Sequence, residues 1–409
     1  MKNKLLIFLI LLSKVALAQE IRTQLWQSDL TLYHQSLEKN HIDLFHQIDR
    51  NIFEKELNTI RNSVDQLSDW GIALRLMRLT RKVGDGHTAV SLANWETTSY
   101  PITVKKISNQ WRVIKVPADQ RDILGTMLES IDGTKIADIE KKLASVAQYV
   151  ENPHSETTRI ANYMTIGELL HELKITKSPR KAAFGLMSDE GKLTKVNLNT
   201  LPDTQLAKLK YKQLGVLTSS VVMPIDIHFE YLWYTTVRNK KATYIRFDGY
   251  PKFEKMLSFV EKLLVFIEQN QSEQVVIDLR NNEGGDLYVG LVLANALNLI
   301  DKIDWINGVY VLTSATTFSA ATSNAALFRQ LLNAKIVGMP TGSNPTGYQD
   351  MGYFVLPCSK LRITYSKRMF RLHETATVGV VPDILIEQNW YDYSKGVDNV
   401  LEDVVDMLY

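Results

Sequence analysis

The stretch VYVLTSATTFSAATSNAALF, residues 309–328, places an apolar strand-like run before a helix-like run, with a hydroxyl-rich turn between them. The run Val309–Thr313 is typical of a buried strand, and the residues after Ser319 are typical of a helix. One interpretation is that Ser319 caps that helix, because serine oxygens accept bonds from free helix N–H groups. The other is that Ser319 is a nucleophile, whose oxyanion the helix N-terminus would stabilise. This stretch alone favours the cap, so the rest of the chain must decide.

Strand-like and helix-like segments alternate on both sides of this stretch. KATYIRFDGY, QVVIDLR and AKIVG read as strands, while KFEKMLSFVEKLLVFIEQN and GLVLANALNLI read as helices. Such repeated units predict a mainly parallel sheet with helical crossovers, here an α/β core over residues 231–409.

The sequence before the core divides into three parts. Helical periodicity over residues 19–95, ending in the turn GDGHT, predicts a helical N-terminal region. Short strands, an Asp-Gly turn and a helix, as in ILGTMLESIDGTKIADIEKKL, predict an α+β module over residues 96–201. Residues 202–230 are then expected to form a linker.

The bulk composition is that of an ordinary globular protein. The chain has 409 residues, 45% hydrophobic and 22% charged, which suits two or three domains. Its net charge of +2 gives no argument for a nucleic-acid partner. The single cysteine, Cys358, cannot form an intramolecular disulfide, so the folded state must depend on its core.

The first residues predict a secretory signal peptide over residues 1–18. Lys2 and Lys4 form a basic start, Leu5–Leu12 is an apolar run, and Ala16-Leu17-Ala18 is a cleavage signal. The apolar run is too short to span a bilayer, and no cysteine follows it to carry a lipid. We therefore expect export to the periplasm or the outside, with no membrane anchor after cleavage.

A second turn could complete a site around Ser319. DLRNNEGGD, residues 278–286, begins at the carboxyl end of a buried strand, where open parallel sheets place their ligands. Gly284-Gly285 lets the backbone turn with exposed N–H groups. Together with the amide of Ala320, these groups could hold an oxyanion, although a plain β-to-α turn would look the same.

A nucleophilic serine also needs a base, and two histidines are candidates. His87 lies in the Gly-flanked turn GDGHT, and His373 lies beside Glu374. A turn histidine by itself is more often a solvated loop residue. None of the eight histidines has the spacing of a zinc site, so neither a metal nor another cofactor is expected.

Five motifs, in order, carry a family resemblance: GDGHT, DLRNNEGG, TSATTFSAAT, GMPTG and GVVPD. Together they resemble the tail-specific (C-terminal processing) proteases and their tricorn-type relatives, which are serine peptidases. The resemblance covers residues 84–95 and 231–390, and more loosely the region between. It implies a crotonase-like or ClpP-like mixed sheet with helical crossovers, a helical N-terminal region, and a PDZ-like module at residues 96–201.

The resemblance also implies site residues. The nucleophile of the T-x-S-A-A motif is Ser319, and the oxyanion donors are Gly284, Gly285 and Ala320. The lysine that tail-specific members use as a base falls on Asn344, whose amide cannot act as one. The match is therefore better to the tricorn-type branch, which uses a histidine oriented by a late glutamate.

In that branch the base falls on His87 and the glutamate on Glu374, with Asp85 and Asp278 as alternatives for the acid. Two residues depart from the family pattern: Thr322 replaces a common glutamate, and Gly86 replaces a serine before the histidine.

These inferences predict an exported serine peptidase that forms an acyl-enzyme on Ser319 with His87 as base. Its partner would be a peptide or unfolded protein, no nucleic acid is expected, and oligomers are left open. The alternative is a non-catalytic binding protein for an apolar ligand or peptide, as in the interphotoreceptor retinoid-binding proteins on the same fold.

Overall fold

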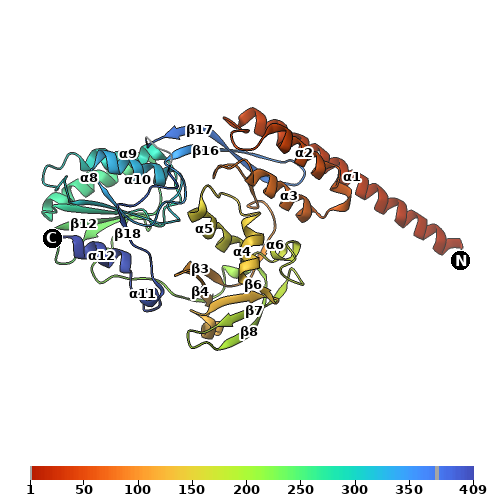
Figure 1. Cartoon of the computed structure of the whole chain (residues 1–409), viewed down its shortest axis with the longest axis horizontal. Helices are drawn as coiled ribbons and strands as arrows, with labels where there is room; N and C mark the ends of the chain where they lie inside the picture. Colours follow the sequence, from red (N-terminus) through yellow and green to blue (C-terminus); the bar gives the residue numbers. More distant parts are fainter. Residues whose placement is uncertain (1, 374–376) are drawn as a thin grey trace.

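The α/β core is built on a six-stranded mixed sheet in the order β11-β12-β13-β14-β15-β18 (Figure 1). The computed structural model describes residues 2–373 and 377–409, with side chains from residue 17 onward. All neighbouring strands are parallel except the edge pair β11 and β12. The strands are β11 (Leu232–Thr236), β12 (Ala242–Phe247), β13 (Gln274–Asp278), β14 (Val309–Thr313), β15 (Lys335–Gly338) and β18 (Ile384–Leu385). The fold is thus mixed α/β with helical crossovers, as predicted.

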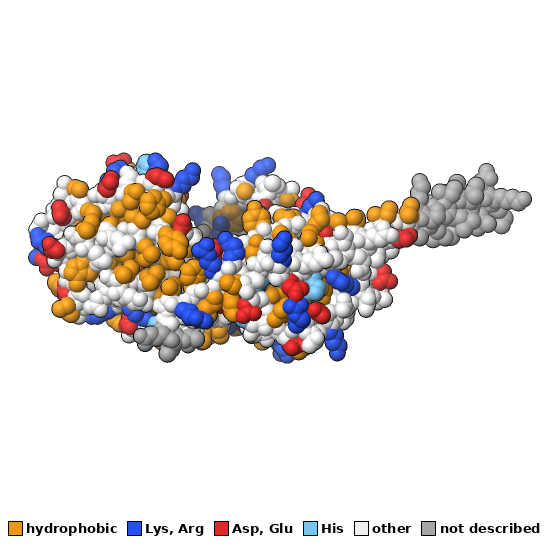
Figure 2. Space-filling view, turned by 90° about the horizontal axis from the view of Figure 1, so that it is seen from above, with side chains coloured by type: hydrophobic (Ala, Val, Ile, Leu, Met, Phe, Trp, Pro, Cys, Tyr) orange, Lys and Arg blue, Asp and Glu red, His pale blue; other side chains and the backbone are white. Residues whose placement is uncertain are grey.

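Helices cover both faces of this sheet, and alternate side chains of each strand serve each face. Val275 and Ile277 of β13 pack in one apolar cluster with three helices, while Val276 packs in another with the last helix. All five residues of β13 and of β14 are buried, as the apolar runs predict. The helices are α8 (Phe253–Gln269), α9 (Leu287–Leu297), α10 (Ala320–Leu331) and α12 (Asn399–Met407), with the short α11 (Trp390–Ser394) before α12. Figure 2 shows apolar side chains among charged ones on the outer surface of the core.

A long hairpin joins the core to the N-terminal helices. Strands β16 (Thr346–Val355) and β17 (Arg362–Arg371) leave the core and pair with β1 (Ala89–Ser91) in a separate sheet (Figure 1). The register sets Ala89 opposite Thr364. Because β1 directly follows the GDGHT turn, this pairing fixes that turn against the core.

The N-terminal region is helical, as predicted. It contains α1 (Lys2–Asn40), α2 (Arg50–Arg61), the 3₁₀ turn η1 (Val64–Gln66) and α3 (Asp69–Arg81). Asp49 and Ser68 cap α2 and α3, because their side chains accept hydrogen bonds from first-turn amides. Within the described part of the chain, no helix is long and apolar enough to cross a membrane.

The α+β module lies beside both other parts (Figure 1). Its main sheet has the order β10-β4-β5-β7-β8, with β3 pairing with β4 and β6 pairing with β5. Strand β10 lies in the stretch predicted as a linker, yet it pairs with β4. The strands are β2 (Thr98–Ser99), β3 (Thr103–Ile107), β4 (Gln110–Pro117), β5 (Met127–Ile131), β6 (Thr134–Lys135), β7 (Lys181–Met187), β8 (Leu193–Asn199), β9 (Leu201–Pro202) and β10 (Tyr211–Gln213). The helices are η2 (Ala118–Ile123), α4 (Ile136–Ala144), α5 (Pro153–Tyr163), α6 (Gly167–Glu172) and α7 (Asp203–Leu206).

Candidate active site

Ser319 lies between β14 and α10, where it occupies the N-cap position without capping the helix. Its side chain makes no hydrogen bond to the first amides of α10. Instead, Oγ lies 2.8 Å from Nε2 of His87. The backbone has φ 53° and ψ −126°, a conformation that non-glycine residues rarely adopt. Such strain is common where a side chain must be presented at a functional site, so the structure does not support the helix-cap interpretation.

A short chain of hydroxyl groups holds this strained turn. The amide of Ser319 donates to Ser343 Oγ at 2.7 Å, and Ser343 donates to Thr322 Oγ1 at 2.9 Å. Thr322 in turn donates to the carbonyl of Thr317 at 3.0 Å. All three hydroxyl residues beyond Ser319 are buried. Thr322, which replaces the glutamate that the resemblance would place there, thus supports the turn that carries Ser319.

Asp85 holds the turn that carries His87. Its Oδ1 accepts the backbone N–H groups of His87 at 2.9 Å and Thr88 at 2.8 Å, and the hydroxyl of Ser366 at 2.7 Å. Its Oδ2 accepts a hydrogen bond from His41 Nε2 at 2.9 Å. Burial alone would raise the pKa of Asp85, but these hydrogen bonds and the nearby His41 outweigh it and lower that pKa to about 2. Asp85 therefore stays ionised.

Burial lowers the pKa of His87 from its ordinary value. The Asp85 carboxylate and the backbone carbonyl of Tyr348 act against this effect and raise that pKa, while the Arg159 guanidinium lowers it. Nδ1 is buried and makes no hydrogen bond of ordinary geometry to the described residues. The net result is a neutral imidazole at neutral pH, which is the form that can accept a proton from Ser319.

Gly86 has no room for the serine that the resemblance would place before His87. A Cβ at Gly86 would lie 2.7 Å from the Phe318 ring and 2.8 Å from Cβ of Glu151. The Phe318 ring also contacts the His87 ring, with 5.3 Å between centroids. Phe318 thus takes the space that a side chain at position 86 would need.

The Gly284-Gly285 turn lies directly against Ser319. Gly284 has φ +106°, and a Cβ there would come within 2.7 Å of Ser319 Cβ. Its amide, however, donates to Asn282 Oδ1 at 2.9 Å, which differs from the predicted role as an oxyanion donor. The amides of Gly285 and Ala320 have no hydrogen-bond partner among residues 2–373 and 377–409. These two amides are therefore free to donate to an oxyanion.

Three acids were predicted as candidates to orient His87. Glu374, the predicted acid, lies outside them. Asp278 is paired with Arg280 at 2.7 Å and accepts the Tyr244 hydroxyl at 2.7 Å. It therefore supports the core sheet and does not contact His87. Asp85, the other alternative, holds the backbone of His87, as described above.

The two rival bases have other contacts. Asn344, at the lysine position of the tail-specific branch, accepts hydrogen bonds from Asn152 Nδ2 at 3.1 Å and from the Gly379 amide at 2.9 Å. It is a structural link between the module and the core. The backbone carbonyl of His373 accepts a hydrogen bond from Thr346 Oγ1, and this contact does not involve the imidazole ring.

Two side chains of the module that sequence reasoning missed also approach the site. Glu151 has a buried Oε2 without a hydrogen-bond partner among the described residues, and burial raises its pKa well above the ordinary value. Arg159 of α5 lies against Phe318. No spacing pattern could have indicated them, because only the fold brings α5 to the carboxyl end of the core sheet.

A cluster of His41, His46 and Asp85 resembles a metal site in composition. His41, however, accepts the Asp43 amide at Nδ1 and donates to Asp85 from Nε2, both at 2.9 Å. Both of its ring nitrogens are therefore used by protein partners. His41 thus holds Asp85, while His46 Nδ1 lies 2.8 Å from the Asp43 carbonyl oxygen.

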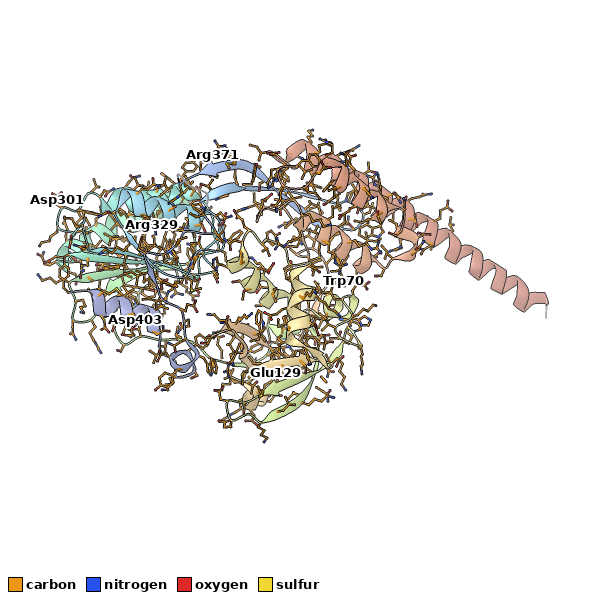
Figure 3. All side chains as sticks on the ribbon, viewed as in Figure 1. Trp70, Glu129, Asp301, Arg329, Arg371 and Asp403 are labelled. Atoms are coloured by element: carbon orange, nitrogen blue, oxygen red, sulfur yellow. The ribbon has the colours of Figure 1, made fainter. Side chains whose placement is uncertain are left out.

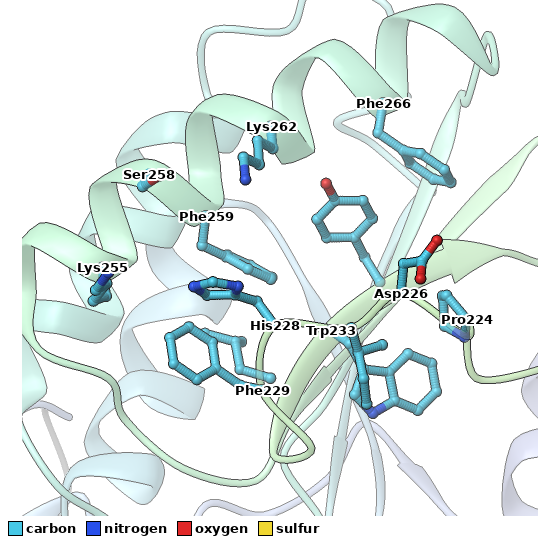
Figure 4. A pocket seen from close by; sticks show the side chains of 13 residues that line it. Pro224, Asp226, His228, Phe229, Trp233, Lys255, Ser258, Phe259, Lys262 and Phe266 are labelled. Carbon is cyan, nitrogen blue, oxygen red and sulfur yellow. The ribbon is translucent and has the colours of Figure 1, made fainter.

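A cavity of about 510 Å³ lies elsewhere, between α8, β11 and residues 224–229 (Figure 4). Aromatic side chains line it, among them Phe229, Trp233 and Phe259. Its lining includes neither Ser319 nor His87. The candidate site around Ser319 and His87 is therefore separate from this cavity.

Comparison with solved structures supports the fold. Mature CPAF superposes with a TM-score of 0.67 at 14% identity, covering 95% of this chain and 97% of that chain. Mature CPAF complexed with lactacystin gives 0.63 at 15%, covering 96% and 99%. The photosystem II D1 C-terminal processing protease gives 0.42 at 11%, covering 90% and 93%, which is too low to support an argument. No family model and no curated protein matches the sequence. The chain therefore has the fold of CPAF over nearly its full length.

Proposed function

We propose that this protein is a serine peptidase that forms an acyl-enzyme on Ser319, with His87 as general base. The observation that carries the proposal is the 2.8 Å contact between Ser319 Oγ and His87 Nε2, made by residues 232 positions apart. Two further features support it: the strained backbone of Ser319, and the free amides of Gly285 and Ala320 beside it. The likeness to CPAF supports the fold on which this site is built.

In the proposed reaction, Ser319 Oγ attacks the carbonyl carbon of a peptide bond while His87 Nε2 takes the hydroxyl proton. The carbonyl oxygen becomes an oxyanion, which the amides of Gly285 and Ala320 and the N-terminus of α10 stabilise. His87 then gives its proton to the leaving amine. Water, activated by His87, hydrolyses the acyl-enzyme and restores Ser319.

The site favours a histidine base over a lysine. Asn344 occupies the lysine position, and its side-chain oxygen is held by Asn152 and Gly379. We therefore place the protein with the tricorn-type branch. The role of Glu374 as the acid that stabilises the imidazolium remains a prediction.

Export and substrate capture are further parts of the proposal. The basic start, apolar run and Ala16-Leu17-Ala18 signal support release to the periplasm or the outside. The α+β module would act as a PDZ-like module that binds an extended peptide or unfolded protein at a sheet edge. Its position beside the site supports this role.

The test is hydrolysis of fluorescence-quenched peptides by the full chain and three variants. Ser319→Ala should lower turnover by roughly 10⁴ to 10⁶, and His87→Ala should also abolish most activity. His373→Ala is the matched control and should stay near the parent. Turnover by Ser319→Ala within about tenfold of the parent would contradict the proposal, as would loss in His373→Ala with activity retained in His87→Ala.

A further inference from the structure

A buried arginine of the module lies beside the nucleophile. Arg159, in the middle of α5, places its guanidinium carbon 5.0 Å from the ring centre of Phe318, the residue directly before Ser319. The same ring is 5.3 Å from the His87 ring, so Phe318 lies in contact with both. The guanidinium also lowers the pKa of His87 through its charge. Arg159 is therefore within electrostatic reach of the reacting groups.

The guanidinium has a free hydrogen-bonding side. Nε donates to the Tyr149 carbonyl at 3.3 Å, and Nη1 donates to Glu283 Oε2 at 2.9 Å. Nη2 has no hydrogen-bond partner among the described residues. An arginine can bind a carboxylate through two parallel bonds, so Nη2 together with Nη1 would suit a substrate carboxylate once Glu283 leaves Nη1.

The existing partner is well placed for exchange. The Glu283 side chain is 57% exposed, whereas that of Arg159 is only 11% exposed. The carboxylate of Glu283 can therefore turn into solvent at little cost, while the arginine cannot leave the site. Glu283 also directly precedes Gly284, so the exchange would occur at the edge of the oxyanion turn.

Among the described residues, three other acidic groups near the site do not compete for Arg159. Asp85 is held by His41 and by the His87 turn. Asp350 is paired with Lys367 at 3.1 Å and with Arg368 at 3.2 Å. Burial raises the pKa of Glu151 well above its ordinary value, which disfavours its charged form.

We infer that Arg159 is a specificity-determining residue that binds a carboxylate of the substrate near the scissile bond, displacing Glu283. This inference rests on the proposed peptidase function and names the substrate chemistry of that site. A hydrogen bond to a charged group in this poorly solvated position should favour a Glu-containing peptide over its Gln counterpart about tenfold to a hundredfold in kcat/KM.

The experiment uses matched peptides on the full chain. Each peptide of the first set carries one Glu, placed at a different position around the cleaved bond. The second set carries Gln at the same positions, and both sets end in an amide. A third set carries Gln and a free terminal carboxylate, which separates an internal side chain from a chain end as the source. The variants are Arg159→Gln, Glu283→Gln and the control Arg329→Gln, whose arginine pairs with Asp383 on the same core (Figure 3).

We expect the parent and Arg329→Gln to prefer one carboxylate position about tenfold or more. Arg159→Gln should lose the preference, measured within that variant as the ratio of kcat/KM for the Glu peptide to kcat/KM for its Gln counterpart. Glu283→Gln should strengthen the preference, because the competing carboxylate is gone. A carboxylate preference that survives in Arg159→Gln would overturn the inference. So would an unchanged preference in Glu283→Gln, and this second result holds even if Arg159→Gln folds poorly. Turnover of Gln peptides by the parent without any carboxylate preference would overturn the inference alone. If no peptide is hydrolysed, the proposed function fails and the inference fails with it.

Discussion

Replacing Asp85 by Asn should destabilise the fold and disturb His87, because an amide cannot satisfy the donors around this position. Oδ1 accepts three hydrogen bonds, and Oδ2 accepts one from His41. His41 Nδ1 accepts the Asp43 amide, so Nε2 must carry the proton that it donates. Either orientation of an asparagine would point its NH₂ group at a donor.

The size of the effect follows from two independent routes. A buried donor left without its acceptor costs about 1–3 kcal/mol. The pKa of Asp85 is lowered from 3.8 to about 2, which corresponds to a stabilisation of the folded state on the order of 2–3 kcal/mol. We therefore expect Asp85→Asn to lower the free energy of unfolding by about 2–4 kcal/mol at pH 7.

The assay is urea unfolding at pH 7, with Asp122→Asn as the control because that carboxylate is exposed. The folded-state pKa is depressed, so the contribution of Asp85 is present above about pH 4 and is lost as pH falls from about 4 through about 2. The difference between parent and Asp85→Asn should shrink over that range. A difference at pH 7 within about 0.5 kcal/mol of the control would refute the reasoning.

Three further outcomes follow from the site. Gly284→Ala should abolish most activity, because the added Cβ would lie 2.7 Å from Ser319 Cβ. The control Gly191→Ala, also at positive φ but with nothing within 4 Å of the added Cβ, should keep kcat/KM near the parent value. Equal activities of the two variants would contradict the predicted clash. The acid limb of the pH profile of kcat/KM should lie below pH 6.5, because burial lowers the pKa of His87 and activity is lost as this base becomes protonated. An acid limb well above pH 6.5 would point to another base. Ser343→Ala should lower kcat by roughly tenfold or more with a smaller change in KM, because the Ser319 amide loses its 2.7 Å partner; an unchanged kcat would show that the strained turn holds without it.

Local patterns were sufficient to predict the core. The apolar runs of β13 and β14 and the helices between them identified a mainly parallel sheet, because burial on both faces leaves a continuous apolar signature. The turns at the carboxyl ends of two neighbouring strands then predicted that Gly284 and Ser319 would lie together, and they do.

Longer-range features could not be predicted in the same way. Pairing of β1 with β17 brings residues 89–91 against residues 362–364. No local periodicity indicates a contact between segments so far apart in the sequence. The same holds for α5, whose Arg159 reaches the nucleophile only through packing of the module on the core. The Gly284 amide was predicted as an oxyanion donor, but it donates to the side-chain oxygen of Asn282 instead. This hydrogen bond forms only in the folded turn.

The long hairpin of β16 and β17 links the N-terminal region to the core. Asp85 holds the backbone of His87 and accepts a hydrogen bond from Ser366 of β17, while β17 pairs with β1, so the proposed base and nucleophile are joined through the long hairpin. The N-terminal region is thus part of the proposed catalytic machinery. A core beginning near residue 231 would keep Ser319 but lack its base.

The most direct test of the central claim is reaction with a fluorophosphonate probe, followed by mass spectrometry to locate the label. We predict that the full chain is modified at Ser319, that the rate falls as pH drops through the pKa of His87, and that His87→Ala reacts far more slowly. A folded protein that takes up no label, or that is labelled elsewhere while Ser319 stays free, would contradict the account.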